Sequence, residues 1–491
     1  MHPDQLPIFQ VTLPLIAAPL AFLLNQRIVA WVIALIASLC AAVISMLLLQ
    51  QVTISGEIIT EIGGWPAPWG IEYRVDMVNA FVLLIVSSLS TVTLLFARAS
   101  VAREIPEDKQ CLFYTTWLLC LTGLLGVTIT GDAFNVFVFL EISSLSSYVL
   151  IAMGRDRRAL TASFQYLVMG TIGATFILIG IGFLYISTGT LNMADMAVRL
   201  EAMESSRTIE SAFAFIVVGI GLKLAMFPLH LWLPNAYAFA PSAVSAFLAA
   251  TATKVALYML LRFVYTIFGI DFAFASMPLT EILLILAVPA VLIPSTVAIF
   301  QDNVKRMLAY SSVAQIGYML LGMAMATQAG LTASILHLFN HALMKGGLFL
   351  ALGCVVYRIG GANLNQLAGL SKRMPWTFAA LIGGGLSLIG VPLTAGFASK
   401  WLLVSAALSD GWWPLAVVVL VGSLLSIIYI WRLVEAAYFR ADDGEVERQE
   451  APLGLLIPTW ILIAANIYFG IYTELSIGVS KQAAAWLMGA G

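Results

Sequence analysis

The sequence predicts an all-α protein that crosses a lipid bilayer many times. Of its 491 residues, 61% are hydrophobic and only 10% are charged, whereas a soluble globular chain averages about 25% charged residues. The apolar residues are grouped in runs of about 20, which is the length of a helix that spans a hydrocarbon core of about 30 Å. Because lipid cannot satisfy free backbone groups, each run is expected to be a helix. The formal net charge of −2 gives no indication of a nucleic-acid partner.

Fourteen apolar runs are long enough to cross the membrane, and the positive charges support that number. Lysine and arginine are retained in cytoplasmic loops, so they should be enriched in every second loop. Fifteen of the 24 lysines and arginines lie in one set of alternate loops, five belong to the other side, and four lie inside the runs. We therefore predict fourteen spans with both termini outside the cytoplasm. The runs fall near residues 6–24, 29–49, 76–98, 109–129, 131–152, 161–187, 211–233, 242–266, 279–300, 304–326, 329–357, 376–409, 413–437 and 452–476.

Two of these runs are interrupted by proline, and each of the two carries a lysine. Lys223 precedes Pro228 in the seventh run, and Lys400 follows Pro392 in the twelfth. Broken helices at corresponding positions of two halves indicate a transport site. The copies are five runs apart, an odd spacing that places them in opposite orientations, so we predict inverted five-helix repeats with helices 7 and 12 discontinuous. The predicted divisions are residues 1–108 (helices 1–3 with an outer loop), 109–266 (first repeat), 279–437 (second repeat) and 438–491 (cytoplasmic loop and helix 14).

Three connecting segments are long enough to have a character of their own. Residues 51–75 combine β-branched residues with a Gly-Gly-Trp-Pro turn, which predicts a short hairpin over the outer face. Residues 189–210 are polar and mixed in charge, so we expect a solvated loop. Residues 440–451 form the longest charged run, which we interpret as a solvated cytoplasmic loop.

Ionisable residues within the first predicted repeat are candidates for function. Glu141 lies about ten residues into the fifth run, and Lys223 and Lys254 lie within the seventh and eighth. A charge at the bilayer centre costs roughly 2.5–3.5 kcal/mol on insertion scales. Burial disfavours the charged form of a lysine and a nearby carboxylate favours it, so a Glu141–Lys223 pair would be a switchable proton carrier. The alternatives are that Glu141 snorkels to the interface and that the lysines only cap carbonyls freed at a helix break.

A second group of polar residues lies in the eleventh run. His337, His341 and Lys345 are spaced at i, i+4 and i+8, so they share one helical face at intervals of about 6 Å. Because histidine titrates near neutrality, such a column suits a proton relay. Zinc binding is an alternative, but no carboxylate or cysteine stands at matching spacing, and a structural role for either histidine stays open.

Composition also bears on ions and cofactors. The four cysteines form no CxxC pair, and the sequence has no nucleotide-binding glycine loop or iron–sulfur spacing. We therefore predict no metal and no bound cofactor. Glu141 is the one carboxylate that lies deep in an apolar run, whereas a dehydrated Na⁺ site takes several hard oxygen ligands. A single carboxylate among lysines fits protons better than sodium.

These residues carry a resemblance to a known family, the antiporter-like subunits shared by the Mrp cation/proton antiporters and the membrane arm of respiratory complex I. It covers most of the chain, and its strongest segments are Asn135–Glu141 (NVFVFLE), Lys223–Pro234 (KLAMFPLHLWLP), Ala309–Gly322 (AYSSVAQIGYMLLG), Asn340–Leu350 and Gly390–Lys400. The resemblance implies fourteen transmembrane helices with inverted five-helix repeats. The residues of this chain at the family's key positions are Glu141, Lys223, Lys254 and Lys400, with His337, His341 and Lys345 on the central polar axis.

Within the family, the NVFVFLE segment looks most like the D-type chain of Mrp complexes. That similarity implies a multisubunit Na⁺ or K⁺/H⁺ antiporter in a bacterial inner membrane, with partners of the Mrp A, B, C, E, F and G types. The chain lacks the long C-terminal helical extension of the A-type and L-type subunits. Lys400 stands where one complex I subunit type carries glutamate, which disfavours that type. The complex I N-type, a non-redox proton-pumping subunit of an oxidoreductase, and subunits of membrane-bound hydrogenases remain alternatives.

Overall fold

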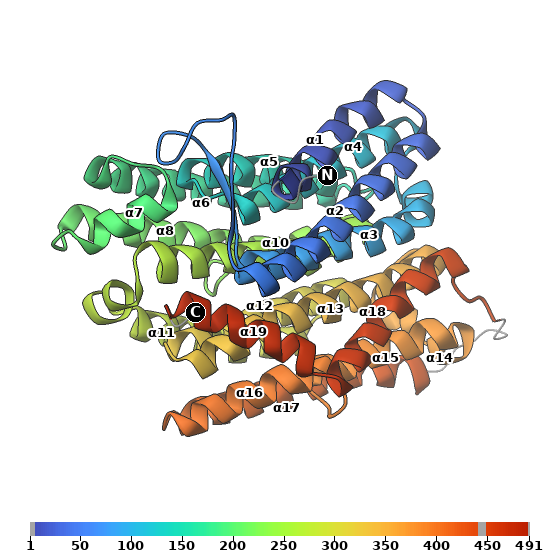
Figure 1. The fold of residues 1–491 in the computed structure, drawn as a ribbon. Coiled ribbons are helices and arrows are strands. Elements are labelled where there is room, and N and C mark those ends of the chain that lie inside the picture. The colour runs from blue at the N-terminus through green and yellow to red at the C-terminus, as the bar shows by residue number, and fades with distance from the viewer. Residues whose placement is uncertain (1–4, 440–447, 490–491) are drawn as a thin grey trace.

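The chain forms a bundle of long helices lying side by side, as seen in the computed structural model, which describes residues 5–439 and 448–489 (Figure 1). The helices are α1 (Leu6–Leu24), α2 (Arg27–Ser55), α3 (Met77–Glu104), α4 (Gln110–Ile129), α5 (Ala133–Ala152), α6 (Arg158–Thr188), α7 (Met193–Glu201), α8 (Arg207–Leu224), α9 (Trp232–Phe239), α10 (Ser242–Leu261), α11 (Leu279–Ile299), α12 (Val304–Ala324), α13 (Gln328–Ile359), α14 (Leu370–Arg373), α15 (Pro375–Ile389), α16 (Ala395–Ser409), α17 (Trp413–Tyr438), α18 (Leu453–Ile471) and α19 (Glu474–Leu487). Two π-helices, η3 (Arg262–Ile267) and η4 (Asp271–Ser276), follow α10.

Twelve helices of the described chain are long and apolar enough to cross a membrane. They are α1 to α6, α10 to α13, α17 and α18. Their many exposed leucines and isoleucines, such as Leu23, Ile54 and Ile285, would be unfavourable in water but lie naturally against lipid tails. The predicted class, an all-helical protein that crosses the membrane many times, is confirmed.

Two further apolar segments each consist of a pair of shorter helices. The α8 helix ends at Leu224, where Ala225 has a left-handed backbone (φ +58°), and α9 begins only at Trp232. In the second pair, α15 ends at Ile389, Gly390 has φ +90°, and α16 begins at Ala395. Both interruptions coincide with the prolines that the sequence places there, since proline removes a backbone donor and clashes with the preceding turn.

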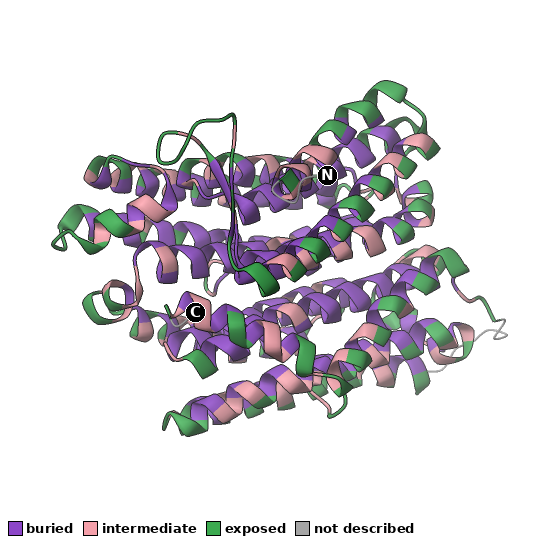
Figure 2. Cartoon of the chain, in the orientation of Figure 1, coloured by how far each residue is buried: buried purple, intermediate pink, exposed green. Residues whose placement is uncertain are grey.

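The core of the bundle is made by α4, α10, α12 and α13. The most apolar stretches of α10 and α12 are 94% buried, that of the span containing α4 is 83% buried and that of α13 is 78% buried, whereas those of α2, α6, α11 and α17 are 39% buried. Figure 2 shows the same contrast, with continuous buried surface along α10 and α12 and mixed surface on the peripheral helices. The polar residues of the core helices are therefore shielded from both lipid and water.

The connecting segments agree with the sequence in one case and differ in another. The predicted hairpin is present: β1 (Ile58–Glu61) pairs with β2 (Glu72–Val75) in an antiparallel register that places Ile58 opposite Val75. Residues 189–210, expected to be a solvated loop, instead contain α7, whose Asn192 side chain caps the first turn by accepting from the Asp195 amide. The prediction was wrong because α7 is amphipathic and buries Met193 and Met196 against the bundle.

The C-terminal region also contains more helix than the sequence analysis expected. After α18, a separate helix, α19, follows, and most of it lies beyond the last predicted span, which ends near residue 476. One face of α19 is buried against the bundle, through Ser476, Ser480, Ala483, Ala484 and Leu487. Most of the charged segment 440–451 lies outside the described residues, so its predicted character stays a prediction.

Candidate functional site

Glu141 and Lys223 form an ion pair in the first half of the chain. Glu141 lies in the middle of α5, and Lys223 lies in the last turn of α8. The Oε1 atom of Glu141 is 3.6 Å from Nζ of Lys223, which also donates a 2.7 Å hydrogen bond to Oγ of Ser144. The Lys223 side chain is only 3% exposed and that of Glu141 is 25% exposed. The sequence-predicted pair is therefore present, with Ser144, one turn from Glu141, as an additional partner.

The break after Lys223 is stabilised by aromatic side chains. Trp232, the first residue of α9, donates from Nε1 at 3.0 Å to the Leu222 carbonyl, which at the end of α8 otherwise accepts, among the described residues, only from the Ala225 amide at 3.3 Å. The ring of Trp232 stacks on Tyr166 of α6 with centroids 3.9 Å apart. Because Trp232 meets this need from another helix, Lys223 is left free to pair with Glu141 and Ser144.

Two lysines lie in the core of the bundle. Lys254 of α10 is 1% exposed and donates to the Ala249 carbonyl of its own helix at 2.5 Å. Lys345 of α13 is fully buried and donates to the Leu308 carbonyl of α12 at 2.8 Å and to the Ser311 hydroxyl. Both lysines are therefore held only by neutral acceptors, and no carboxylate of the described chain pairs with either.

The two histidines have different surroundings although their rings are parallel and 6.2 Å apart. His337 is held at both nitrogens, with Nδ1 2.8 Å from Oγ of Ser399 and Nε2 3.0 Å from Oε1 of Gln315. Both ring nitrogens of His341 are buried and contact no donor or acceptor within the described residues. A buried polar group without a partner is uncommon, so His341 is suited to receive a water molecule or a moving proton.

Lys400 occupies the second helix break. Its Nζ donates to the carbonyls of Leu388 and Ile389, at 2.9 and 3.1 Å, and to Oγ of Ser423 at 3.1 Å. It also lies 4.7 Å from the ring centroid of Tyr318, a cation–π contact. Lys400 thus caps the carbonyls freed where α15 ends, and it does so from the helix that follows the break. This contact agrees with the alternative, given in the sequence analysis, that a buried lysine caps carbonyls at a helix break.

The structure brings five of the seven predicted residues into one electrostatic group. The charges of Lys254 and Lys345 act on His341, and those of Lys254 and Lys400 act on His337. Like charges disfavour one another in a poorly solvated interior, so a proton on one of these groups disfavours a proton on its neighbours. The Glu141–Lys223 pair stands apart, since no contact between described residues joins Lys223 directly to Lys254.

Sequence reasoning missed several buried polar residues. Lys305, counted among the loop charges, is 5% exposed and bonds to the Ala240 carbonyl and the Ser242 hydroxyl, each at 3.2 Å. Arg262, counted as an end charge, forms a buried ion pair with Asp76 at 2.6 Å. Neither is marked by local sequence, because the partners are 63 and 186 residues away.

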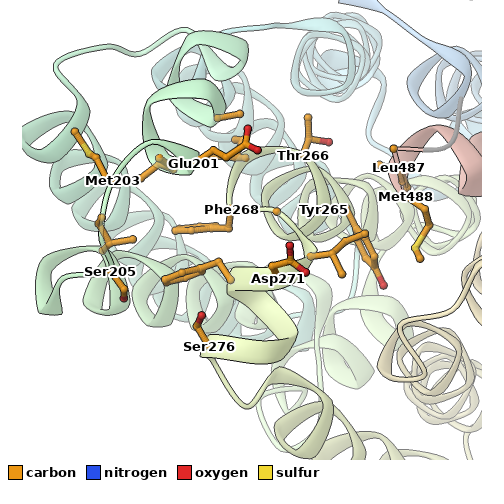
Figure 3. Close-up of a pocket in the computed structure, with 18 of the residues that line it drawn as sticks. Glu201, Met203, Ser205, Tyr265, Thr266, Phe268, Asp271, Ser276, Leu487 and Met488 are labelled. Atoms are coloured by element: carbon orange, nitrogen blue, oxygen red, sulfur yellow. The ribbon is translucent and has the colours of Figure 1, made fainter.

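A cavity of about 810 Å³ lies between α7, the two π-helices and the end of α19, away from the buried lysines and histidines of the core. Glu201 and Asp271 line it together with Tyr265, Phe268 and Met488 (Figure 3). None of the seven predicted residues lines it, so its size does not make it the functional centre.

The fold and the buried lysines and histidines define a polytopic α-helical membrane protein with ionisable side chains in its core. Comparison with known proteins gives the family. The chain belongs to the NADH:quinone oxidoreductase/Mrp antiporter family, whose transmembrane pattern matches residues 130–426. It is a proton-translocating membrane subunit of that family.

Relatives of both branches of the family match nearly the whole chain. The N-type chain of the NADH-quinone oxidoreductase of Desulforudis audaxviator is 39% identical, over 98% of this chain and 99% of its own. The D-type chain of the Na(+)/H(+) antiporter of Bacillus subtilis is 30% identical, over 98% and 97%.

Two solved structures have the same fold. The Mrp complex from Dietzia sp. DQ12-45-1b contains a chain with a TM-score of 0.89 and 25% identity, and the archaeal membrane-bound sulfane sulfur reductase contains one with 0.90 and 33%. Each match covers 99% of this chain and 98% of the other. Both are multisubunit membrane assemblies, so the chain is expected to have other membrane subunits as neighbours.

Proposed function

We propose that this chain carries protons across the membrane by passing them along its buried lysines and histidines. The observation that carries the proposal is the electrostatic group of Lys254, His341, Lys345, His337 and Lys400 in the core. Because these groups disfavour each other's charge, a proton arriving at one promotes release from its neighbour. A scaffold would have no need of such groups at membrane depth.

The proposed path begins at Lys223. It accepts a proton from the cytoplasmic side through the region of α8 to α10, and the charge of Glu141, 3.6 Å away, tunes how readily it does so. Lys254 and His341 pass the proton along the midplane. Lys400 exchanges it with the second half-channel, where its contacts with two carbonyls and Ser423 would break and re-form.

The arrangement of the helices supports a symmetric description of this path. We propose that the pairs α8–α9 and α15–α16 each cross the membrane as one discontinuous helix, which with the twelve candidate spans gives fourteen. Residues 109–266 and 279–437 would then be the two inverted repeats, flanked by residues 1–108 and 438–491. The basic loops would face the cytoplasm and both termini the periplasm of a bacterial inner membrane, in accordance with the positive-inside rule.

The host complex that we propose is a multisubunit Na⁺ or K⁺/H⁺ antiporter of the Mrp type, with this chain in the D position. The 30% identity to a D-type antiporter chain and the fold match to a chain of an Mrp complex support it. The partners would be subunits of the A, B, C, E, F and G types. With one deep carboxylate in the ion-pair site, part of the cation site would lie on those partners.

The second candidate is a proton-pumping subunit of a redox complex, of the N or M type or of a membrane-bound hydrogenase. The 39% identity to an N-type oxidoreductase chain and the 33% identity to a chain of an archaeal respiratory complex favour it. In this case the same path would operate, and the driving force would come from redox chemistry on other subunits.

One experiment tests the path and separates the two hosts. The chain is expressed alone and with its adjacent reading frames in an antiporter-deficient host, and NaCl or KCl is added to everted vesicles holding a respiration-built ΔpH. Dissipation with the neighbours present supports the antiporter. No dissipation, together with proton pumping driven by NADH or hydrogen, supports the redox complex. Absence of all proton movement from vesicles that contain the assembled complex would contradict the proposed function itself.

A further inference from the structure

A second cavity, of about 510 Å³, lies at the end of the bundle where the basic loops gather. Its walls are the last turn of α3, the start of α6, the turn between α9 and α10, the start of α12 and the chain that follows α13. It is thus lined by both predicted repeats. None of the residues assigned to the proton path lines it.

The cavity is strongly basic. Five cationic side chains line it, and two carboxylates do: Arg103, Arg155, Arg158, Lys305 and Arg306 against Glu104 and Asp156. Both carboxylates have partners of their own. Asp156 pairs with Arg158 at 2.6 Å, and Glu104 accepts from the Ser242 amide at 2.9 Å and from its hydroxyl at 3.1 Å.

Four of the five cations have no described carboxylate within ion-pair distance, and one of these, Lys305, is held by a carbonyl and a hydroxyl. Across the described chain, Arg103, Arg155 and Arg306 have no ion-pair partner, and Arg103 lies over the ring of Tyr357 at 4.7 Å. The Nε atom of Arg306 is buried and has no hydrogen-bond acceptor. A buried guanidinium nitrogen without an acceptor is costly, so the cavity combines an excess of positive charge with a donor that lacks an acceptor.

We propose that this cavity binds a phosphate-bearing anion that bridges the two halves of the chain. Guanidinium groups match phosphate geometry through paired N–H donors, and three arginines without an ion-pair partner line this one cavity. Basic pockets between transmembrane helices bind the headgroups of anionic lipids. The aromatic and apolar side chains of Phe239, Val356 and Tyr357 in the same wall suit an anion attached to an apolar tail. A free phosphate compound carries the same recognising chemistry.

The test measures binding to the full-length chain, so it is independent of whether the chain transports protons. The delipidated chain is titrated with dioleoylphosphatidylglycerol, with phosphatidylcholine as the neutral-headgroup comparison, and bound lipid is counted by native mass spectrometry. Inorganic pyrophosphate is titrated in a parallel arm. The variant Arg103→Gln/Arg155→Gln/Arg306→Gln is compared with Lys372→Gln, which removes an exposed positive charge outside the cavity.

Each basic residue near a membrane surface contributes about fivefold to binding of anionic lipid, so the triple variant should bind on the order of 100-fold more weakly. Lys372→Gln should bind as the natural chain does. Binding of phosphatidylglycerol that pyrophosphate does not displace assigns a lipid headgroup, and binding of pyrophosphate alone assigns a soluble anion. Equal binding by the natural chain and the triple variant overturns the proposal, as does binding of neither probe. If the triple variant does not fold, the exposed Arg155→Gln alone should still weaken binding about fivefold.

Discussion

Replacing Glu141 by glutamine tests the ion pair on which the proposed path begins. The substitution keeps the shape of the side chain and the Ser144 partner of Lys223, and it removes one charge 3.6 Å from the lysine nitrogen. At the effective dielectric constant of about 20 that suits protein interiors, two unit charges at this distance attract by about 5 kcal/mol. Since Glu141 is 25% exposed, water screens part of that attraction.

We therefore expect Glu141→Gln to slow proton movement by roughly 10-fold to 1000-fold, since each 1.4 kcal/mol corresponds to a factor of ten. The loss should be smaller at acid pH, because a higher proton concentration compensates for the weaker attraction of Lys223 for its proton. The assay is the quenching of a ΔpH-sensitive dye in everted vesicles across a range of pH, with the amount of assembled protein measured by immunoblot.

Two controls make this result specific. Glu141→Asp retains the charge on a shorter side chain and should keep more activity than Glu141→Gln. Glu281→Gln removes an exposed carboxylate from the first turn of α11 and should have no effect. Unchanged transport and an unchanged pH profile in assembled Glu141→Gln would refute the electrostatic role, and so would equal losses in all three variants.

Three further predictions concern Lys400, the two histidines and the buried Arg262–Asp76 pair. Lys400→Met should abolish proton movement because methionine cannot take up or release a proton at the second helix break. Normal flux in the dye assay would remove Lys400 from the path. His341→Phe should lose transport with little change in the thermal unfolding temperature, since His341 makes no hydrogen bond within the described chain. His337→Phe should also lower the free energy of unfolding, by about 1–3 kcal/mol for each of Ser399 and Gln315 left unpaired. Equal stability of the two variants would contradict this distinction. Asp76→Asn should destabilise the protein by about 3–5 kcal/mol because it leaves Arg262 charged and buried. The measurement is the unfolding temperature in detergent, which should fall. The double variant with Arg262→Gln should lose less stability than the sum of the two single variants.

Much of the fold follows from patterns that are local in sequence. The length of the apolar runs predicts each spanning helix, and Pro228 and Pro392 predict the two interruptions, because both effects act within one or two helical turns. The spacing of His337 and His341 likewise places them on one face, as the parallel rings confirm. The segment 189–210 was misjudged, because its helix is short and depends on burying two methionines against other parts of the bundle.

Most partners of the charged side chains could not be predicted from local sequence patterns. The sequence identified Glu141, Lys223, Lys254, Lys345 and Lys400 as charges at membrane depth, since each stands in an apolar run. The sequence also predicted the Glu141–Lys223 pair, which the structure contains. The contacts of Lys345 with α12 and of Lys400 with the end of α15 were decided by tertiary packing. The buried Arg262–Asp76 pair joins residues 186 positions apart, as no local pattern could indicate. A charge in lipid must find a partner within a few ångströms, and only the packing of helices distant in sequence determines which partner lies within that distance.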